Sequence, residues 1–414
     1  MPATSVLQQF ARRLNPVSLA ALAFWLAGAL SSNACIAEHS STQNKATEAA
    51  ESTTVDPSAR FAIESMLRDL ATACMAGDTD GYMKHVSQGD REFLNEQRYF
   101  ARDLAKKPAS ECQWTISELN FNNHRATGLL TIEWTMLGAK PRSVSFDVAF
   151  EQLPAEESGV WRYAGETWKR HEAPGVLVLF DPQFKELPAR VADAFLHVRS
   201  HVEAGFLLTN KQLSTRTQKL KLYKTMKHLQ ASICLSYVDG LSGWNEPGES
   251  IKLLAREQST PKSLHYLIAH EYGHVATFEL GPKANEIAWW ILEGVAELSA
   301  ESWGTTSQGI VSAWATHGRL APWEEITNFE TVRPKWRGHV YSQGHHMLGY
   351  ISESFGREKR VAWLSALAAG ATLDSATFEQ LKLTFEQLDR NWRASLPAAE
   401  GDVKRETNPT PHDE

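Results

Sequence analysis

Apolar residues recur with helical spacing at the start of the folded part of the chain and alternate with polar residues after it. The apolar residues Phe61, Ile63, Met66, Leu67, Leu70 and Met75 have helical spacing, and Gly77-Asp78 ends the pattern, which predicts a helix. A second short helix is predicted around residues 82–86. Alternating stretches separated by turn-forming residues then predict the strands of an antiparallel meander, at 114–116, 126–137, 144–153 and 160–168. Helices followed by such strands predict an α+β region.

The pattern changes again after residue 171. Short apolar runs predict strands at 175–180, 219–223, 231–237 and 250–255, and a long helical pattern covers 187–203. Two further segments, 263–278 and 287–298, have apolar residues at helical spacing. The second part of the chain is therefore predicted to be mainly helical, with a small mixed sheet.

The length of 414 residues predicts two domains with appendages. We assign residues 60–170 to the first domain and 171–397 to the second. Residues 38–59 are rich in small polar and acidic residues and predict a disordered linker, and residues 398–414 predict a disordered tail.

The first 37 residues predict a secretory signal. Arg12 and Arg13 precede an apolar run of fourteen residues, 17–30. A membrane-spanning helix needs about twenty apolar residues, so this run is too short for a comfortable span. Cys35 follows this run where bacterial lipoproteins carry a lipid-modified cysteine, although Ser32 stands where leucine is usual. Lipoprotein and plainly secreted forms both stay open, and the protein is expected in the periplasm, the cell envelope or the medium.

Composition limits the partners. The formal net charge of −7 gives no electrostatic reason to expect nucleic acid. A membrane is expected only through the lipid anchor or during export, and the oligomeric state is left open. Beyond Cys35, Cys74 and Cys112 could form a disulfide or remain buried free thiols.

The run His270-Glu271-Tyr272-Gly273-His274 carries the chemistry. Two histidines four positions apart share one face of a helix, so their nitrogens can converge on one metal ion. Glu271 then stands beside the metal, where a general base takes a proton from water. Two histidines on an amphipathic helix can also be ordinary surface or core residues.

Two carboxylates on the next predicted helix favour the metal site. Glu293 follows His274 by nineteen positions, and Glu297 lies one turn later on the same face. Glu293 would be the third ligand of a single Zn²⁺, which leaves a position open for water as in catalytic zinc sites. Glu297 would orient a ligating histidine from outside the ligand set, or it is a solvated charge.

These residues resemble the gluzincin metallopeptidases. His270, Glu271 and His274 match the HExxH of that family, and residues 290–297 resemble its W-x-x-E-G-x-A-E segment, in which the first Glu binds zinc. The resemblance covers residues 171–397. Within the family, this part of the chain is similar to the bacterial peptidase MA-like group. It implies that Tyr341 stabilises the oxyanion of the tetrahedral intermediate. The competitors for this role are Tyr350, His339, His345 and His346, and Tyr341 could instead be a packed core tyrosine.

A second resemblance covers residues 60–170, which look like the cone-shaped fold of the nuclear transport factor two and cystatin-like superfamily. It implies an accessory or interaction domain.

The sequence therefore predicts an exported zinc metallopeptidase that acts on a peptide or protein. The alternatives are a peptidase homologue that mainly binds a partner, and a zinc hydrolase of another envelope amide. The gluzincin resemblance implies that the strand at residues 250–255 is an edge strand that pairs with extended substrate. Glu246 and Glu249 could hold a substrate amine or be a plain acidic loop.

Overall fold

The computed structural model describes residues 57–154, 159–208, 216–304 and 306–397, which all belong to one compact unit. The predicted signal with Cys35, most of the linker and the tail lie outside the described residues. Helix α3 begins at Pro57, three residues inside the segment predicted as linker.

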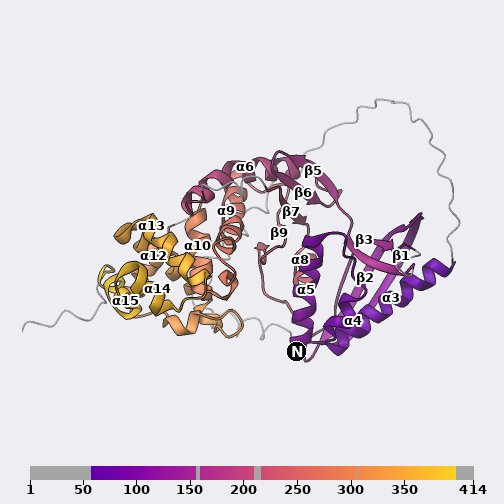
Figure 1. The fold of residues 1–414 in the computed structure, drawn as a ribbon, viewed down its shortest axis with the longest axis horizontal. Helices are drawn as coiled ribbons and strands as arrows, with labels where there is room; N and C mark the ends of the chain where they lie inside the picture. Colours follow the sequence, from indigo (N-terminus) through magenta and orange to yellow (C-terminus); the bar gives the residue numbers. More distant parts are fainter. Residues whose placement is uncertain (1–56, 155–158, 209–215, 305, 398–414) are drawn as a thin grey trace, which may run out of the picture. The chain divides into compact units, whose positions relative to one another are not determined.

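The first region consists of helices followed by an antiparallel sheet (Figure 1). Asp78 and Asp90 cap α4 and α5 by accepting hydrogen bonds from backbone N–H groups in the first turn. The sheet has the order β1-β2-β3-β4, and each strand pairs with the next. The elements are α3 (Pro57–Ala76), α4 (Thr79–Met83), α5 (Arg91–Lys106), β1 (Ala109–Asn122), β2 (Arg125–Met136), β3 (Arg142–Gln152) and β4 (Trp161–Glu166).

The predicted meander is present, and α3 lies along the sheet (Figure 1). Ile63, Leu67 and Leu70 of α3 are buried in one cluster with Trp114 and Leu130 of the sheet. This cluster follows from the two periodicities, since helical spacing and alternation each gather apolar residues on one face. The region therefore consists of helices packed on an antiparallel sheet, which agrees with the predicted α+β class. Its relationship to the cone-shaped superfamily stays a prediction.

The three described cysteines are free thiols. Cys74 on α3 and Cys112 on β1 lie beside each other, and the neighbouring Cys112 thiol, together with burial, raises the pKa of Cys74. The disulfide considered from the sequence is not formed between these two residues in this structure.

A second, mixed sheet follows. It has the order β5-β6-β7-β9-β8, in which β6, β7 and β9 run parallel and the two outer strands run antiparallel to their neighbours. The strands are β5 (Lys169–Ala173), β6 (Val176–Phe180), β7 (Gln218–Tyr223), β8 (Gly243–Trp244) and β9 (Ile251–Leu254).

Two predictions in this sheet are wrong. The predicted edge strand β9 is interior, because all four of its residues are buried and β8 pairs with its outer side. Residues 231–237, predicted as a strand, contain the end of helix α8 (Met226–Ile233) and the turns after it. Thr225 caps that helix through the N–H of His228, a local signal that outweighs the short apolar run.

The rest of the chain is helical. Helices α9, α10 and α12 pack side by side (Figure 1) and share one large core with α6 and the parallel strands. Among the described residues, no helix is both long and apolar enough to cross a bilayer. The helices are α6 (Leu187–Gly205), α9 (Pro261–Phe278), η2 (Ala284–Glu286), α10 (Trp289–Ala300), α11 (Gln308–Thr316), η3 (Trp323–Ile326), η4 (Pro334–Trp336), α12 (Arg337–Phe355), α13 (Arg357–Ala368), α14 (Leu373–Leu381) and α15 (Phe385–Ala394).

Candidate metal centre

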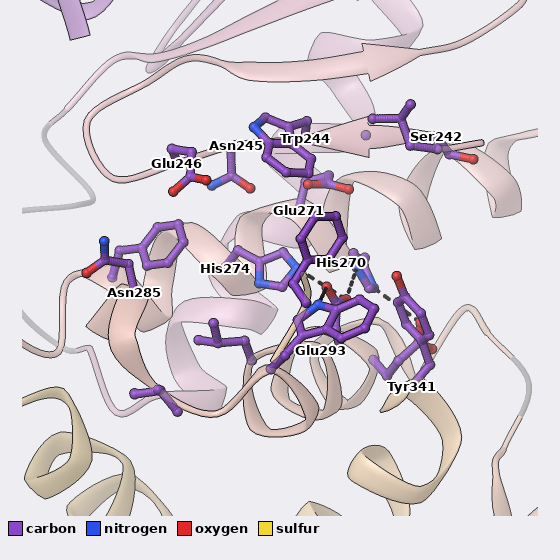
Figure 2. A pocket seen from close by; sticks show the side chains of 18 of the residues that line it. Ser242, Trp244, Asn245, Glu246, His270, Glu271, His274, Asn285, Glu293 and Tyr341 are labelled. Atoms are coloured by element: carbon purple, nitrogen blue, oxygen red, sulfur yellow. Dashed lines mark hydrogen bonds and ion pairs between the residues drawn. The ribbon is translucent and has the colours of Figure 1, made fainter. Parts of the chain in front are cut away.

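Helix α9 carries the HExxH residues. Thr260 caps the helix by accepting from the N–H of Ser263, and Pro261 occupies the first turn, where a missing N–H costs nothing. Leu264 and Ile268 bury one face of α9 in the core. His270 and His274 are only partly buried, so their rings turn toward a cavity rather than into the core (Figure 2).

Helix α10 lies close against α9 because the contact is made by small residues. A Cβ atom added to Gly273 would lie 2.8 Å from the Ser299 hydroxyl oxygen and 3.1 Å from the Ala296 Cα. Both distances are shorter than ordinary van der Waals contact, so a larger residue here would have to displace the Ser299 side chain and shift α10 slightly. This close approach brings Glu293 and Glu297 of α10 beside the histidines of α9.

Three of these side chains converge on one point. The ligand atoms of His270, His274 and Glu293 lie within 4.8 Å of one another. Glu293 Oε2 is 3.3 Å from His270 Nε2 and 3.6 Å from His274 Nε2. Ligands about 2.0–2.1 Å from a tetrahedral zinc ion are separated by about 3.4 Å. The observed spacing therefore fits a zinc ion, which would lie between the three atoms.

Glu293 has one oxygen tied down and one left for a metal. The indole N–H of Trp289 donates a hydrogen bond of 2.8 Å to Oε1. Oε2 is buried and has no hydrogen-bond partner, which is costly for a carboxylate oxygen unless a cation or another donor compensates it. Oε2 is the atom that faces both histidines, so a cation bound between the three side chains would compensate it.

The predicted outer carboxylate lies beside a ligating histidine. Glu297 Oε1 is 3.3 Å from His270 Nδ1, the ring nitrogen that faces away from Glu293, and this nitrogen has no hydrogen-bond partner in the structure. The orienting role of Glu297 stays a prediction. The hydroxyl of Tyr266 donates to both oxygens of Glu297, at 2.8 and 2.9 Å. Tyr266 and Trp289 were not singled out from the sequence. Trp289 stands four residues before its partner Glu293, an i, i+4 spacing that could have identified it. Tyr266 is 31 residues from its partner Glu297, so no local spacing indicates that contact.

The electrostatics of the cluster are those of a tightly paired group. Burial alone would lower the pKa of His270, but the Glu293 and Glu297 carboxylates raise it well above its usual range. Burial opposes the low pKa of Glu293, and His274 and His270 lower it strongly. The carboxylates and His270 thus stabilise each other's charged forms, and binding of a divalent cation would compete with the proton on His270.

Glu271 is buried, with 5% of its surface exposed, and lies beside the metal ligands. Burial raises the pKa of its carboxyl, and His270 and His274 oppose the rise. On its other side stands Gly243 of the edge strand β8, where an added Cβ would be 2.2 Å from Glu271 Oε1. Glu271 therefore sits between the metal helix and the edge strand.

Tyr341 of α12 lies beside His270, on the side away from His274 (Figure 2). Its ring centroid is 6.4 Å from that of His270 and 6.0 Å from that of Trp289. Burial, followed by the Glu293 charge, holds the pKa of Tyr341 well above its usual range, so its hydroxyl keeps its proton and can donate.

The close crossing of α10 and α12 determines how near Tyr341 lies to the metal ligands. A Cβ on Gly294 would lie 2.5 Å from the carbonyl carbon of Gly344, and one on Gly344 would lie 2.2 Å from the Trp290 carbonyl oxygen. The two glycines let the helices touch backbone to backbone. As a result, the helix with Tyr341 lies directly against the helix with Glu293.

The competitors of Tyr341 lie elsewhere, since none of them lines the cavity beside the metal ligands. His339 is bonded to the Arg319 carbonyl at 2.9 Å and stacks on Trp314. His346 accepts from the Trp392 indole at 3.0 Å. His345 approaches Glu301 at 3.8 Å. Each of these three histidines is thus engaged in packing contacts, whereas Tyr341 lines the cavity.

The cavity in front of the cluster has a volume of about 780 Å³. Its walls are the segment 240–246 with β8 on one side and residues 285–293 and 327–330 on the other. Six glutamates line it, and Lys106 is the one lysine or arginine among its described lining residues. The cavity is therefore acidic and would favour the binding of cationic groups.

Two polar residues of the β8 wall face this space (Figure 2). Asn245 is 9% exposed, and neither its amide nitrogen nor its carbonyl oxygen has a partner. Burial and the nearby Glu249 raise the pKa of Glu246 to about 7. Glu249 itself does not line the cavity, because it is bonded to Lys252 at 3.0 Å behind the wall. The predicted acidic pair is thus split between the cavity and the interior.

No protein-family model matches this chain, and no curated protein matches it. Among solved structures, it is similar to an M1 zinc metallopeptidase from Deinococcus radiodurans, with 14% sequence identity and a TM-score of 0.37. The similarity covers 71% of this chain and 64% of that one, so the chain spans less than two thirds of the length of that enzyme. A similarity of this size decides neither fold nor function, and the assignment depends on the geometry of the site.

Proposed function

We propose that this protein is a zinc-dependent metallopeptidase. The observation that carries the proposal is the convergence of His270, His274 and Glu293 on one point, where Glu293 Oε2 faces both histidines and has no hydrogen-bond partner. Two histidines and one carboxylate are the ligand set of catalytic rather than structural zinc, because the fourth position stays open to water.

Each residue of the site has a role that its position supports. A zinc ion bound by the three ligands would supply Lewis-acid activation of a water molecule and of the scissile carbonyl. Glu271 takes a proton from the attacking water and delivers it to the leaving nitrogen. The raised pKa of the buried Glu271 suits a carboxyl that must both accept and return a proton. Tyr341 donates a hydrogen bond to the carbonyl oxygen of the substrate as negative charge develops there.

The cavity supports a peptide as the substrate. The edge strand β8 lines it with Gly243 and Trp244, and an extended peptide can add to such an edge through its main chain. The acidic lining favours peptides with a free amine or basic side chains. We further propose, from the amino-terminal sequence, that the enzyme is exported and meets peptides or proteins of the cell envelope or the surroundings.

The first prediction tests this assignment. Purified full-length protein should contain about one zinc per chain and should cleave members of an unbiased peptide library. Glu271→Gln should keep the zinc and lower kcat by about 10²- to 10⁴-fold, because a glutamine cannot take the proton. Metal analysis and library cleavage are measured on both proteins. Wild-type protein that binds zinc but cleaves no peptide would indicate a binding protein or a hydrolase of another amide. Equal cleavage by both proteins would remove Glu271 from the mechanism.

A further inference from the structure

We propose that helix α5, in the N-terminal region, is a positioning element of the cavity. It holds the segment 245–250 so that Asn245 presents its amide to the main chain of the substrate. This inference rests on the proposed peptidase function. It assigns to the first region a part in substrate binding, in place of the separate accessory role implied by its sequence.

The first step concerns the contacts of α5 with this segment, which follows β8 and leads to β9. The amide of Asn95 donates to the carbonyl of Gly248 at 3.2 Å, and the hydroxyl of Tyr99 donates to the carbonyl of Pro247 at 3.3 Å. Gly248 has a φ of +77°, and an added Cβ would be 2.7 Å from the Asn95 amide nitrogen. The helix and the turn are therefore fitted to each other, since only glycine allows both this conformation and this approach.

The second step is a buried anchor beneath these contacts. Glu96 of α5 is 3% exposed and accepts from Lys221 of β7 and from the hydroxyl of Ser250, at the end of the segment. Lys252 of β9 is paired with Glu249 at 3.0 Å. These contacts are costly to break, because removing one partner of a buried ion pair leaves the other charge without compensation. They therefore fix one end of the segment to α5 and to the sheet.

The third step is what this segment carries into the cavity. Asn245 and Glu246 come directly before the residues held by α5, and both line the cavity. Asn245 is 9% exposed, its side-chain amide has no partner for either polar atom, and it faces the cavity beside the ligand cluster (Figure 2). A carboxamide carries N–H donors and a carbonyl acceptor side by side, so it can donate to the carbonyl and accept from the N–H of a peptide main chain. The ligand that matches it is therefore the main chain of an extended peptide.

The same helix also reaches the cavity directly. Lys106, the last residue of α5, lines the cavity and pairs with Glu330 of the opposite wall at 3.0 Å. Arg102, one turn earlier, is among the charges that hold down the pKa of Glu246, against burial and Glu249, which raise it. Helix α5 thus contacts the segment from behind and meets the cavity at its end.

The experiment compares three full-length variants with the wild type. Asn95→Ala/Tyr99→Phe removes both hydrogen bonds to the segment and keeps the Tyr99 ring. Asn245→Ala removes the amide itself. Arg91→Ala changes an exposed residue at the start of the same helix and is the matched control.

We expect the double variant to raise KM for a cleaved peptide by about five- to tenfold, as two hydrogen bonds of ordinary strength imply, with kcat and zinc content unchanged. Asn245→Ala should raise KM similarly, and Arg91→Ala should change nothing. Hydrogen exchange of the amides in residues 245–250 should become about tenfold faster in the double variant alone.

The readouts separate this inference from the proposed function. Unchanged exchange and unchanged KM in the double variant would overturn the positioning role while wild-type cleavage stands. A KM that rises in the double variant but not in Asn245→Ala would overturn the role of the amide. If wild-type protein cleaves nothing, the exchange measurement still tests whether α5 holds the segment, and binding of the peptide to zinc-loaded wild type and Asn245→Ala tests the amide.

Discussion

At the scale of single residues, both helices of the metal centre use the same device. Tyr266 precedes His270 by four positions and holds Glu297, which faces that histidine. Trp289 precedes Glu293 by four positions and fixes one of its oxygens. Each helix therefore carries an aromatic donor one turn before its ligand. Trp289 restrains the ligand Glu293 itself, whereas Tyr266 restrains Glu297, the carboxylate beside His270. Such outer partners typically change metal affinity by about 10- to 100-fold.

Trp289→Phe is expected to weaken zinc binding by about 10- to 100-fold, because Glu293 loses the donor that orients it. Competition with a chelator of known affinity measures this. Trp336→Phe is the control, since the Trp336 indole N–H has no hydrogen-bond partner to lose. Equal zinc affinity in the two variants would mean that Trp289 does not orient the ligand.

The candidate metal ligands were predicted from the sequence, but the residues that orient them were not. His270, His274 and Glu293 were predicted because helical spacing determines which side chains share a face, and these three do lie together. Asn245 gave no signal, because its importance comes from burial without a partner. That property depends on what surrounds the residue and cannot be derived from its neighbours in the chain.

At the scale of elements, the short strand β8 has an effect beyond its two residues. It covers the outer side of β9 and brings the backbone of Gly243 against Glu271. The edge strand was expected at residues 250–255, where the apolar run is longer. That run is apolar because the strand is buried between two others, as interior parallel strands are. A strand that borders a cavity needs few apolar residues, so its pattern is weak.

Gly243→Ala is expected to lower kcat by about 10-fold or more with zinc content unchanged, because the new methyl group would overlap Glu271 and displace the base. Steady-state kinetics and metal analysis report the two quantities. Gly309→Ala on α11, where an added Cβ meets nothing within 4 Å, should behave as wild type. A Gly243→Ala enzyme with full kcat would show that Glu271 moves aside without loss.

Helix α5 was also not anticipated from the sequence. Its residues 91–106 are mostly polar, and only Phe100, Ala101, Leu104 and Glu96 are buried. A buried glutamate in this helix reads as polar in a hydrophobic pattern, although it faces the interior. Its partners Lys221 and Ser250 lie 125 and 154 residues away, and a local pattern carries no information about such contacts.

At the scale of the whole molecule, buried charges join the two sheets. Glu96 faces Lys221 and Lys252, and the charges of Glu249 and Glu166 also act on this cluster. Burial alone would raise the pKa of Glu96, but the two lysines lower it to about 2. A carboxylate whose pKa is lower in the folded than in the unfolded state stabilises the fold above its unfolded pKa. That contribution is lost as the pH falls toward 2.

Wild-type protein is therefore expected to lose about 3 kcal/mol or less of unfolding free energy through Glu96 between pH 5 and pH 2. Glu96→Gln should be less stable at pH 6, because Lys221 is left buried without its partner. The difference between the two proteins should shrink at pH 3, because Glu96 is then protonated in the unfolded chain but still ionised in the folded protein. Denaturant unfolding at both pH values measures this, and the exposed Glu133→Gln is the control. A difference that is constant with pH would exclude Glu96 as the source.

The backbone contact between Gly294 and Gly344 restricts which sequences can build this site. At most packing contacts a larger residue on one side can be accommodated by a smaller one on the other. Here each partner already lacks a side chain, and the atoms in the way are backbone atoms. No second substitution at the partner can therefore rescue a first one. Successive single substitutions at these two glycines therefore cannot alter the distance between the helix that carries Glu293 and the helix that carries Tyr341 without disrupting the contact.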